Sequence, residues 1–214
     1  MRILVSTFMD GDEEKVLLAM RALPYDQLAL IGAEDSEKSD SMKMITKLEG
    51  LSGHDVDFRP IPEGGFMEMV DSISEHLSTL CHDASTGRRN QILLNISGGH
   101  KIMGDAALFA AFRLGIESYH CDRVVTRLPV LSGATAKDRF TESQMALLKT
   151  LAERDLLLSE VLEAMKPNSK ASAERTIREL RRLRLLGSRV EEGKVIVFLS
   201  PEGHEAARAI RFAK

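Results

Sequence analysis

The chain has 214 residues, of which 43% are hydrophobic and 29% charged, and its formal net charge at pH 7 is −3. This composition is typical of a soluble, folded protein with one large domain or two smaller ones. No run approaches the ~20 apolar residues of a membrane span, and the N-terminal apolar run is shorter than the ~7–15-residue core of a secretory signal. A membrane protein is therefore excluded, and a cytoplasmic location is expected.

The charges are unevenly distributed along the chain. Residues 141–214 contain 14 Lys and Arg against 11 Asp and Glu, a net charge of +3; the totals of 29 and 32 then leave 15 against 21, a net charge of −6, in residues 1–140. A basic C-terminal third on an acidic body predicts two parts with different partners.

Cysteine and histidine give no sign of a metal site. Cys81 and Cys121 lie in apolar surroundings, outside any C-x-x-C pattern, and are interpreted as reduced core thiols. The six histidines are scattered, with no HExxH or HxxxH spacing. We expect no bound metal.

The first 130 residues alternate short apolar runs with helical patterns. Strands are expected at 1–6, 27–32, 56–62, 92–96 and 117–126, with a polar loop at 7–12. The helices between them have apolar faces at Val16, Met20 and Leu23, at Met44, Ile45, Leu48 and Leu51, at Phe66, Val70, Ile73, Leu77 and Leu80, and within 101–114. This alternation predicts an α/β fold over residues 1–131, a Rossmann-like parallel sheet with helices on both faces.

The pattern changes beyond residue 131. The small and polar residues of 132–140 are expected to form a linker. Three helices are expected next, one marked by Leu148 and Leu151, one over 158–165 that ends before a Pro167-Asn168 turn, and one over 169–186. A two-stranded hairpin around 190–197 and a helix over 201–212 follow. This order predicts a small winged helix-turn-helix domain over residues 141–214.

The segment NISGGHK at residues 95–101 follows a predicted strand and precedes an apolar helix. Ligands of parallel α/β sheets bind outside the carboxyl ends of the strands, and free N–H groups at a helix start attract anions. Two glycines let the backbone approach a ligand closely. The end of the first strand adds hydroxyls and an aromatic ring at a neighbouring position. The candidate ligand-binding residues are Ser6, Thr7, Phe8, Asn95, Ser97, Gly98, Gly99, His100 and Lys101.

Two common nucleotide motifs are absent from this loop. A P-loop requires Gly-Lys-Ser/Thr, whereas Gly104 is followed by Asp105, and the G-x-G-x-x-G fingerprint is missing after the first strand. An ATPase or a NAD enzyme is therefore not indicated, and no cofactor is expected. The alternative that Gly98-Gly99 is only a tight strand-to-helix turn stays open.

The pattern N-[IV]-[ST]-G-G-x-K, leading into a hydrophobic helix, resembles the CARF domain, the CRISPR-associated Rossmann fold. The segment STFMDGDEEKV at residues 6–16 resembles the other ligand-facing segment of that family. The resemblance covers residues 1–130, and the C-terminal domain fits the CARF–winged-helix transcription regulators. It implies a homodimer that binds a cyclic oligoadenylate, with tetra-adenylate as the expected ring. His100 departs from the family, which often has Thr there.

The segment SKASAERTIRELRRLRLLG at residues 169–187 predicts an amphipathic helix with Ala173, Ile177 and Leu180 on its apolar face. The arginines on the opposite face suit guanine edges or phosphates in a major groove. The candidate DNA-binding residues are Lys170, Ser172, Arg175, Thr176, Arg178 and Arg182, with Lys194 on the hairpin. Alternatively, the arginines form a solvated face paired with Glu174 and Glu179. The acidic hairpin tip, Glu191-Glu192, predicts weak contacts with DNA.

Together with these patterns, the resemblance to the CARF family implies a CRISPR-associated transcription regulator, acting in antiviral defence, that binds a cyclic oligoadenylate at a dimer interface and a double-stranded DNA operator through its winged helix. One alternative is a ring nuclease, in which His100 and Lys101 act as base and charge stabiliser. Another is an adaptor whose winged helix docks a protein partner.

Overall fold

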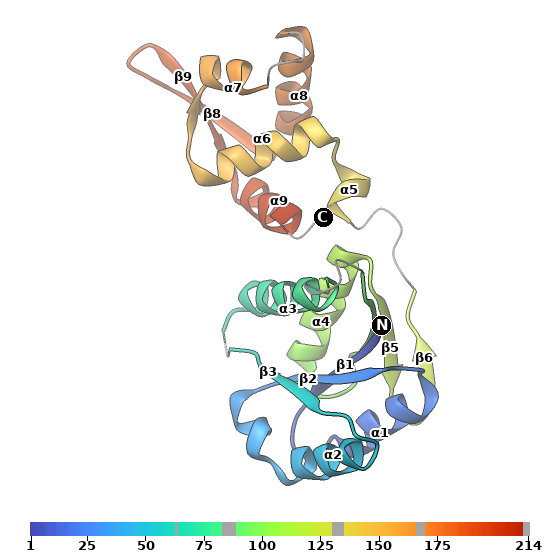
Figure 1. Ribbon diagram of the computed structural model, residues 1–214. Coiled ribbons are helices and arrows are strands. Elements are labelled where there is room, and N and C mark those ends of the chain that lie inside the picture. The colour runs from blue at the N-terminus through green and yellow to red at the C-terminus, as the bar shows by residue number, and fades with distance from the viewer. Residues whose placement is uncertain (63, 83–88, 130–134, 166–169, 212–214) are drawn as a thin grey trace. The chain divides into compact units, whose positions relative to one another are not determined.

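The computed structural model describes residues 1–62, 64–82, 89–129, 135–165 and 170–211 (Figure 1). The chain divides into two compact units, Met1–Leu131 (unit 1) and Ser132–Lys214 (unit 2). Each unit has a core of its own, so each is described separately.

Unit 1 is a Rossmann-like α/β fold around a six-stranded sheet with strand order β3-β2-β1-β4-β5-β6. Its elements are β1 (Arg2–Phe8), α1 (Glu13–Ala22), β2 (Gln27–Gly32), the short 3-10 helix η1 (Glu34–Lys38), α2 (Asp40–Leu51), β3 (Val56–Pro60), α3 (Phe66–Leu80), β4 (Gln91–Asn95), α4 (Lys101–Leu114), β5 (Glu117–Cys121) and β6 (Val125–Arg127). The first five strands are parallel, and β6 pairs antiparallel with β5. The predicted fold class is confirmed.

Helices cover both faces of this sheet, because successive side chains of a strand point to opposite faces. Ile3 and Val5 of β1 pack with residues of α3 and α4, whereas Leu4 and Phe8 pack with residues of α1 and α2. Figure 1 shows the two helix pairs on opposite sides of the strands. The central strand β1 is therefore buried on both faces.

Two details of unit 1 differ from the sequence predictions. The strand expected at 117–126 is a hairpin, because Asp122, Arg123 and Val124 are exposed and form the turn between β5 and β6. The first strand continues to Phe8, where a loop was expected from residue 7. Both deviations change the site, since they decide which side chains reach the carboxyl edge of the sheet.

Local signals determine several helix ends. The Ser39 hydroxyl, just before α2, accepts the Met42 N–H at 3.1 Å. In unit 2, Thr141 and Gln144 cap α6 reciprocally, with N–H to side-chain oxygen distances of 2.9 and 3.3 Å. Gly115, with φ of 65°, ends α4 in the left-handed conformation.

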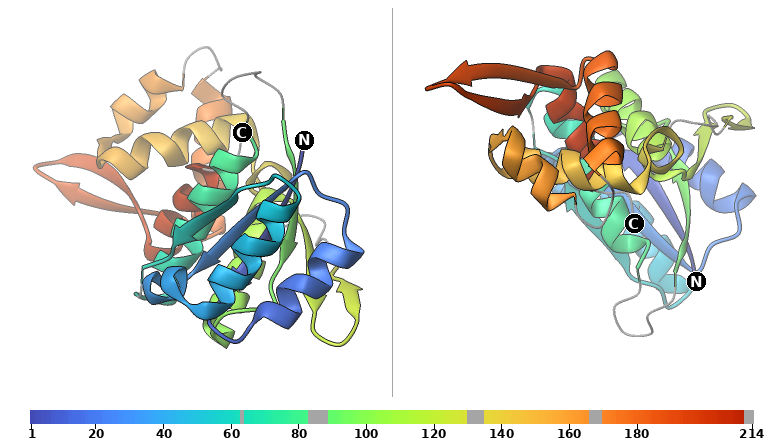
Figure 2. Two further views of the ribbon diagram at one scale, coloured as in Figure 1. Left: turned by 60° about the horizontal axis from the view of Figure 1, so that its bottom comes forward. Right: turned by 90° about the horizontal axis from the view of Figure 1, so that it is seen from above.

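Unit 2 has the order of a winged helix-turn-helix. Its elements are α5 (Ala136–Arg139), α6 (Glu142–Glu153), β7 (Leu156–Leu157), α7 (Leu158–Ala164), α8 (Lys170–Arg182), β8 (Leu186–Glu191), β9 (Lys194–Leu199) and α9 (Pro201–Arg211). The three strands form an antiparallel sheet of order β7-β9-β8. The β8–β9 hairpin extends beyond the helices of its own unit, as both Figure 1 and Figure 2 show.

The expected linker at 132–140 is partly helical. Thr135 accepts the Asp138 N–H at 3.3 Å and starts α5, and Ala136 and Phe140 are buried in the core of unit 2. These two apolar side chains belong to the folded unit, so residues 136–140 are not a linker. Residues 132–134 and the expected Pro167-Asn168 turn lie outside the described residues.

Candidate functional site

The predicted loop lies where the strand order reverses. β2 and β3 lie on one side of β1 and β4 and β5 on the other, so the carboxyl ends of β1 and β4 flank the crevice in which open α/β sheets bind ligands. The loop from Asn95 to His100 leaves β4 there, and α4 begins at Lys101. The predicted position of the loop, between a strand and a helix, is confirmed.

Three of the predicted ligand-binding residues form the buried base of the loop. Ser6, Thr7 and Asn95 are fully buried. Asn95 Nδ2 donates to Ser6 Oγ at 2.8 Å, and Asn95 Oδ1 accepts the Ser97 N–H at 3.1 Å. Thr7 Oγ1 lies 3.4 Å from the Asn95 carbonyl oxygen. These side chains connect β1, β4 and the loop from within, so their hydroxyl and amide groups do not line an open surface.

Phe8 was expected to offer an aromatic face to the ligand, and this expectation is wrong. Its side chain is fully buried in the cluster that also contains Val16 of α1 and Ile45 of α2. Because β1 continues to this residue, Phe8 shares a face with Leu4 and points into the core.

The Asp12 carboxylate connects the glycine loop to the end of β1 through hydrogen bonds, a contact that the sequence did not predict. Its Oδ2 accepts the Gly99 N–H at 2.6 Å and the Met9 N–H at 3.1 Å, and its Oδ1 accepts from Lys15 Nζ at 2.7 Å. Asp12 is 5% exposed. An acidic residue just before a helix suggests a local cap, but the contact with Gly99 joins residues that are 87 positions apart.

Both glycines of the loop are needed by the fold itself. A Cβ on Gly98 would lie 2.1 Å from the Thr7 carbonyl oxygen, a distance that only a backbone shift could relieve. Gly99 has a φ of 74°, which side chains rarely adopt. The tight-turn interpretation thus explains the glycines without any ligand.

The exposed part of the loop carries the groups that suit an anion. His100 and Lys101 are exposed. The N–H groups of Lys101 and Ile102 have no acceptor within the helix, whereas the Met103 N–H already donates to the His100 carbonyl oxygen at 2.8 Å. The Gly99 N–H is taken by Asp12. An anion at this edge would therefore meet the first turn of α4 and the Lys101 ammonium.

Ser97 is held at the border between β4 and β5. Its Oγ accepts the Cys121 N–H and lies 3.3 Å from His120 Nδ1. His120 is exposed at the end of β5. Cys121 itself is fully buried, and burial raises the pKa of its thiol to about 11. Sequence reasoning missed His120, which is 23 positions from Ser97.

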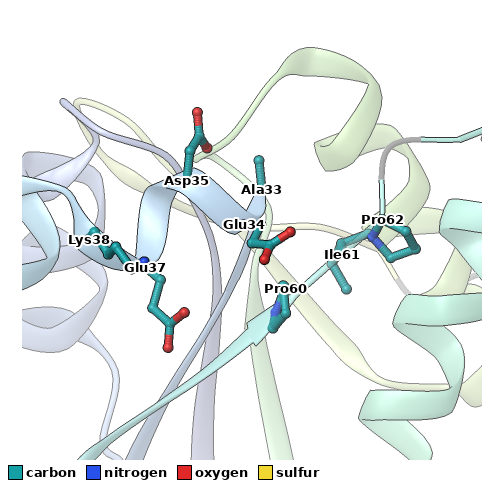
Figure 3. Close-up of a pocket in the computed structure, with 8 residues that line it drawn as sticks. All are labelled: Ala33, Glu34, Asp35, Glu37, Lys38, Pro60, Ile61 and Pro62. Carbon is teal, nitrogen blue, oxygen red and sulfur yellow. The ribbon is translucent and has the colours of Figure 1, made fainter.

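A separate cavity of about 840 Å³ lies at the carboxyl ends of β2 and β3 (Figure 3). η1 lines one side and Pro60, Ile61 and Pro62 line the other. Its charged lining residues are Glu34, Asp35, Glu37 and Lys38. Three carboxylates repel phosphate, so an anionic ligand is better matched by the glycine loop than by this cavity.

In unit 2, α8 separates an apolar from a basic face as predicted. Ala173, Ile177 and Leu180 are buried, whereas Arg175, Arg178 and Arg182 are exposed. Arg175 Nε donates to Glu179 Oε1 at 2.9 Å, an exposed pair of the kind that contributes little to stability. Among the described residues, Arg178 and Arg182 have no ion-pair partner.

The remaining predicted DNA-binding residues of α8 are Thr176, Ser172 and Lys170, and Thr176 is not positioned to contact DNA. Thr176 is 7% exposed and donates to the Ser172 carbonyl oxygen at 3.1 Å, so its hydroxyl is not presented at the surface of α8. Ser172 is exposed, and Lys170 begins the helix.

The hairpin of unit 2 has a second cation besides the exposed Lys194. The tip is a two-residue turn at Glu192 and Gly193, with φ of 50° and 73°. Arg189 on β8 pairs with Glu191 at 2.6 Å and Asp155 at 2.9 Å and lies over the Phe198 ring. Its guanidinium therefore already has two carboxylate partners within unit 2, and the acidic hairpin tip remains unfavourable for phosphate.

Two general features hold for the described residues. No helix among them is long and apolar enough to cross a membrane, and no group of three or more His, Cys, Asp or Glu side chains among them could hold a metal ion.

The fold thus joins a Rossmann-like unit to a winged helix-turn-helix unit. No protein-family model and no curated protein match the chain. Csm6 of Enterococcus italicus, solved with cyclic hexa-2'-fluoro-hexa-dAMP, is similar in structure, with a TM-score of 0.50 and 11% identity over 86% of this chain and 56% of that one. At this identity the similarity concerns the fold alone.

Two further similar structures match less closely. Can2 from Sulfobacillus thermosulfidooxidans, in complex with cyclic tetra-adenylate, has a TM-score of 0.42 and 12% identity over 96% of this chain and 63% of that one. MepR, a transcription regulator of the Staphylococcus aureus multidrug efflux pump MepA, has a TM-score of 0.33 and 18% identity over 36% of this chain and 61% of that one. The chain spans less than two thirds of each of these three proteins.

Proposed function

We propose that the protein is a transcription regulator of the CARF type, in which unit 1 binds a cyclic oligoadenylate within a homodimer and unit 2 binds an operator in double-stranded DNA. The observation that carries the proposal is the presence, in one chain, of an anion-suited loop at the β1–β4 crevice and a winged helix with an arginine face. Tetra-adenylate is the ring that the resemblance favours.

The ligand would be bound at the surface of the loop. The first-turn amides of α4, His100 and Lys101 would contact a phosphate. Ser6, Thr7 and Asn95 would act indirectly, by holding the loop in place from below. Gly98 and Gly99 would let the chain pass close to β1, while Asp12 keeps the loop closed.

Ligand binding is tested by calorimetry with cyclic tri-, tetra- and hexa-adenylate, each mixture being analysed by chromatography after an hour. Tight binding of one intact ring per dimer is the expected result. A linear product would instead indicate the ring nuclease, with His100 and Lys101 as the groups to replace. No heat with any ring would remove the ligand-binding half of the proposal.

DNA binding rests on the exposed arginines of α8. We expect a double variant, Arg178→Ala with Arg182→Ala, to weaken binding to duplexes selected from a random-sequence pool. If both arginines contact phosphate, the slope of log K against log salt should fall by about one for each contact removed. Arg21→Ala, on an exposed position of α1 in unit 1, is the matched control. Equal retention of DNA by the double variant and the control would contradict this role and favour a protein-docking winged helix.

A further inference from the structure

The end of β5 contributes a side chain to the glycine-loop site. The regular pairing of β4 with β5 ends at Asn95 and Tyr119, and the Ile96 N–H donates to the Tyr119 carbonyl oxygen at 3.0 Å. The next N–H of β5 in this direction belongs to Cys121. It donates to Ser97 Oγ, because β4 has by then turned into the loop. The Ser97 hydroxyl thus takes the place of a strand carbonyl.

This arrangement allows the Ser97 hydroxyl to donate its proton to His120. The hydroxyl oxygen accepts from Cys121, and the Ser97 N–H is bound to Asn95 Oδ1. Its remaining neighbour in the described structure is His120 Nδ1, at 3.3 Å. A neutral imidazole that accepts at Nδ1 carries its proton on Nε2. His120 is an exposed residue at the carboxyl end of β5, where such an Nε2–H would be available to a ligand.

A protonated His120 would keep a donor at the same edge. Its Nδ1–H would then donate to Ser97 Oγ, which would turn its own proton away from the ring, and the Nε2–H would remain. In both of these arrangements, the neutral Nε2–H tautomer and the protonated ring, the pair presents a hydrogen-bond donor at Nε2. Such a donor suits an oxygen with negative charge better than a cation or an apolar group.

We propose that His120, oriented by Ser97, is a further ligand-binding residue of this site and donates from Nε2 to a phosphate oxygen of the cyclic oligoadenylate. This inference rests on the proposed function. It extends the site from the β1–β4 crevice to the end of β5, where His120 Nδ1 lies 3.3 Å from the Oγ of the loop residue Ser97.

The test uses the full chain and cyclic tetra-adenylate, with the other two rings in parallel. We expect His120→Ala to weaken binding at least about ten-fold, the loss typical of a hydrogen bond to a charged group. His120→Gln keeps a donor near the Nε2 position and should stay within about three-fold of the wild type. Thr126→Ala is the matched control, because Thr126 is exposed and pairs with His120 across the β5–β6 hairpin. Its affinity should be unchanged.

Side-chain NMR of the histidines separates this role from a structural one. We expect the free wild type to show His120 in the Nε2–H tautomer, Ser97→Ala to lose that preference, and the Nε2 resonance to shift on ligand addition. Melting temperatures identify any variant that fails to fold. If His120→Ala does not fold, the affinity and NMR spectrum of His120→Gln are compared with those of the wild type instead.

The outcomes that contradict the role of His120 differ from those that contradict the proposed function. If the wild type and His120→Ala bind the ligand equally well, or if free His120 is in the Nδ1–H tautomer, the role of His120 is overturned and the proposed function stands. No binding of any ring by the wild type overturns the role of His120 together with the ligand-binding half of the proposed function.

Discussion

Replacing Asp12 by Ala should loosen the glycine loop at a measurable cost in stability. The change removes the acceptor of two backbone N–H groups, those of Gly99 and Met9, at a position where the carboxylate side chain is 6% exposed. A buried donor left without a partner costs about 1–3 kcal/mol. Gly99 and Met9 are half-buried, so we expect the loss of both bonds to lower the free energy of unfolding of unit 1 by about 2–4 kcal/mol, the lower part of the summed range.

Asp12→Asn distinguishes the backbone contacts from the ion pair. Both N–H groups donate to Oδ2, while Lys15 contacts Oδ1. An amide oxygen can keep both N–H bonds while the ion pair to the partly exposed Lys15 is lost, and such pairs contribute about 1 kcal/mol or less. We therefore expect the Asn variant to lie much closer to the wild type.

Urea unfolding followed by far-UV circular dichroism measures these differences, and hydrogen exchange of the Gly99 amide reports on the loop itself. Asp40→Ala is the control, because Asp40 makes the same i,i+3 contact with a lysine at an exposed helix start and should leave stability unchanged. An Asp12→Ala variant that unfolds like the wild type, or an Asn variant as destabilised as the Ala variant, would contradict the stabilising role of the two N–H bonds.

Two further predictions concern unit 1. Gly98→Ala should destabilise it by about 1–3 kcal/mol or more, because the new Cβ would lie 2.1 Å from the Thr7 carbonyl oxygen. The control is Gly50→Ala in α2, where no atom lies within 4 Å of the new Cβ, and it should be neutral or stabilising in thermal melts. Equal melting temperatures for the two variants would show that the β1 backbone moves to accommodate the new methyl group. Burial lowers the pKa of His76 below its ordinary value of about 6.5, so the unfolded chain takes up a proton that the folded one resists. Stability should therefore fall as the pH drops from about 7 to about 5, and His76→Leu should reduce that fall in urea titrations; parallel pH profiles would contradict it.

Local patterns were sufficient to predict most elements. The helix expected at 101–114 and the strand expected at 27–32 have those bounds, because apolar periodicity and a terminal glycine are properties of neighbouring residues. The two-unit order of a Rossmann-like sheet and a winged helix also follows from the succession of such elements. For the same reason the apolar and basic faces of α8 were predicted correctly.

The orientation of α2 could not be predicted in this way. Met44, Leu48 and Leu51 were expected in its buried face, yet they are 39%, 38% and 80% exposed. Of the expected apolar face only Ile45 is buried, beside Met42. The buried face also holds two polar residues, Ser41, which binds residues of the β1–α1 segment, and Glu49, which accepts from the Tyr25 hydroxyl at 2.8 Å. The pKa of the Tyr25 phenol is raised, mainly by burial and also by this hydrogen bond to Glu49. Polar groups occupy the core where distant partners satisfy them, and hydropathy alone does not show those partners.

Adjacent residues encode the glycine loop between β4 and α4, because strand, turn and helix are local patterns of the chain. The side chains that surround this loop depend instead on the folded sheet, which buries Phe8, Ser6 and Asn95, joins Asp12 to Gly99 and brings His120 to Ser97. This follows because parallel strands far apart in sequence become neighbours in the sheet. Their carboxyl ends then share one edge, and the groups that meet there are set by strand order and register rather than by spacing along the chain.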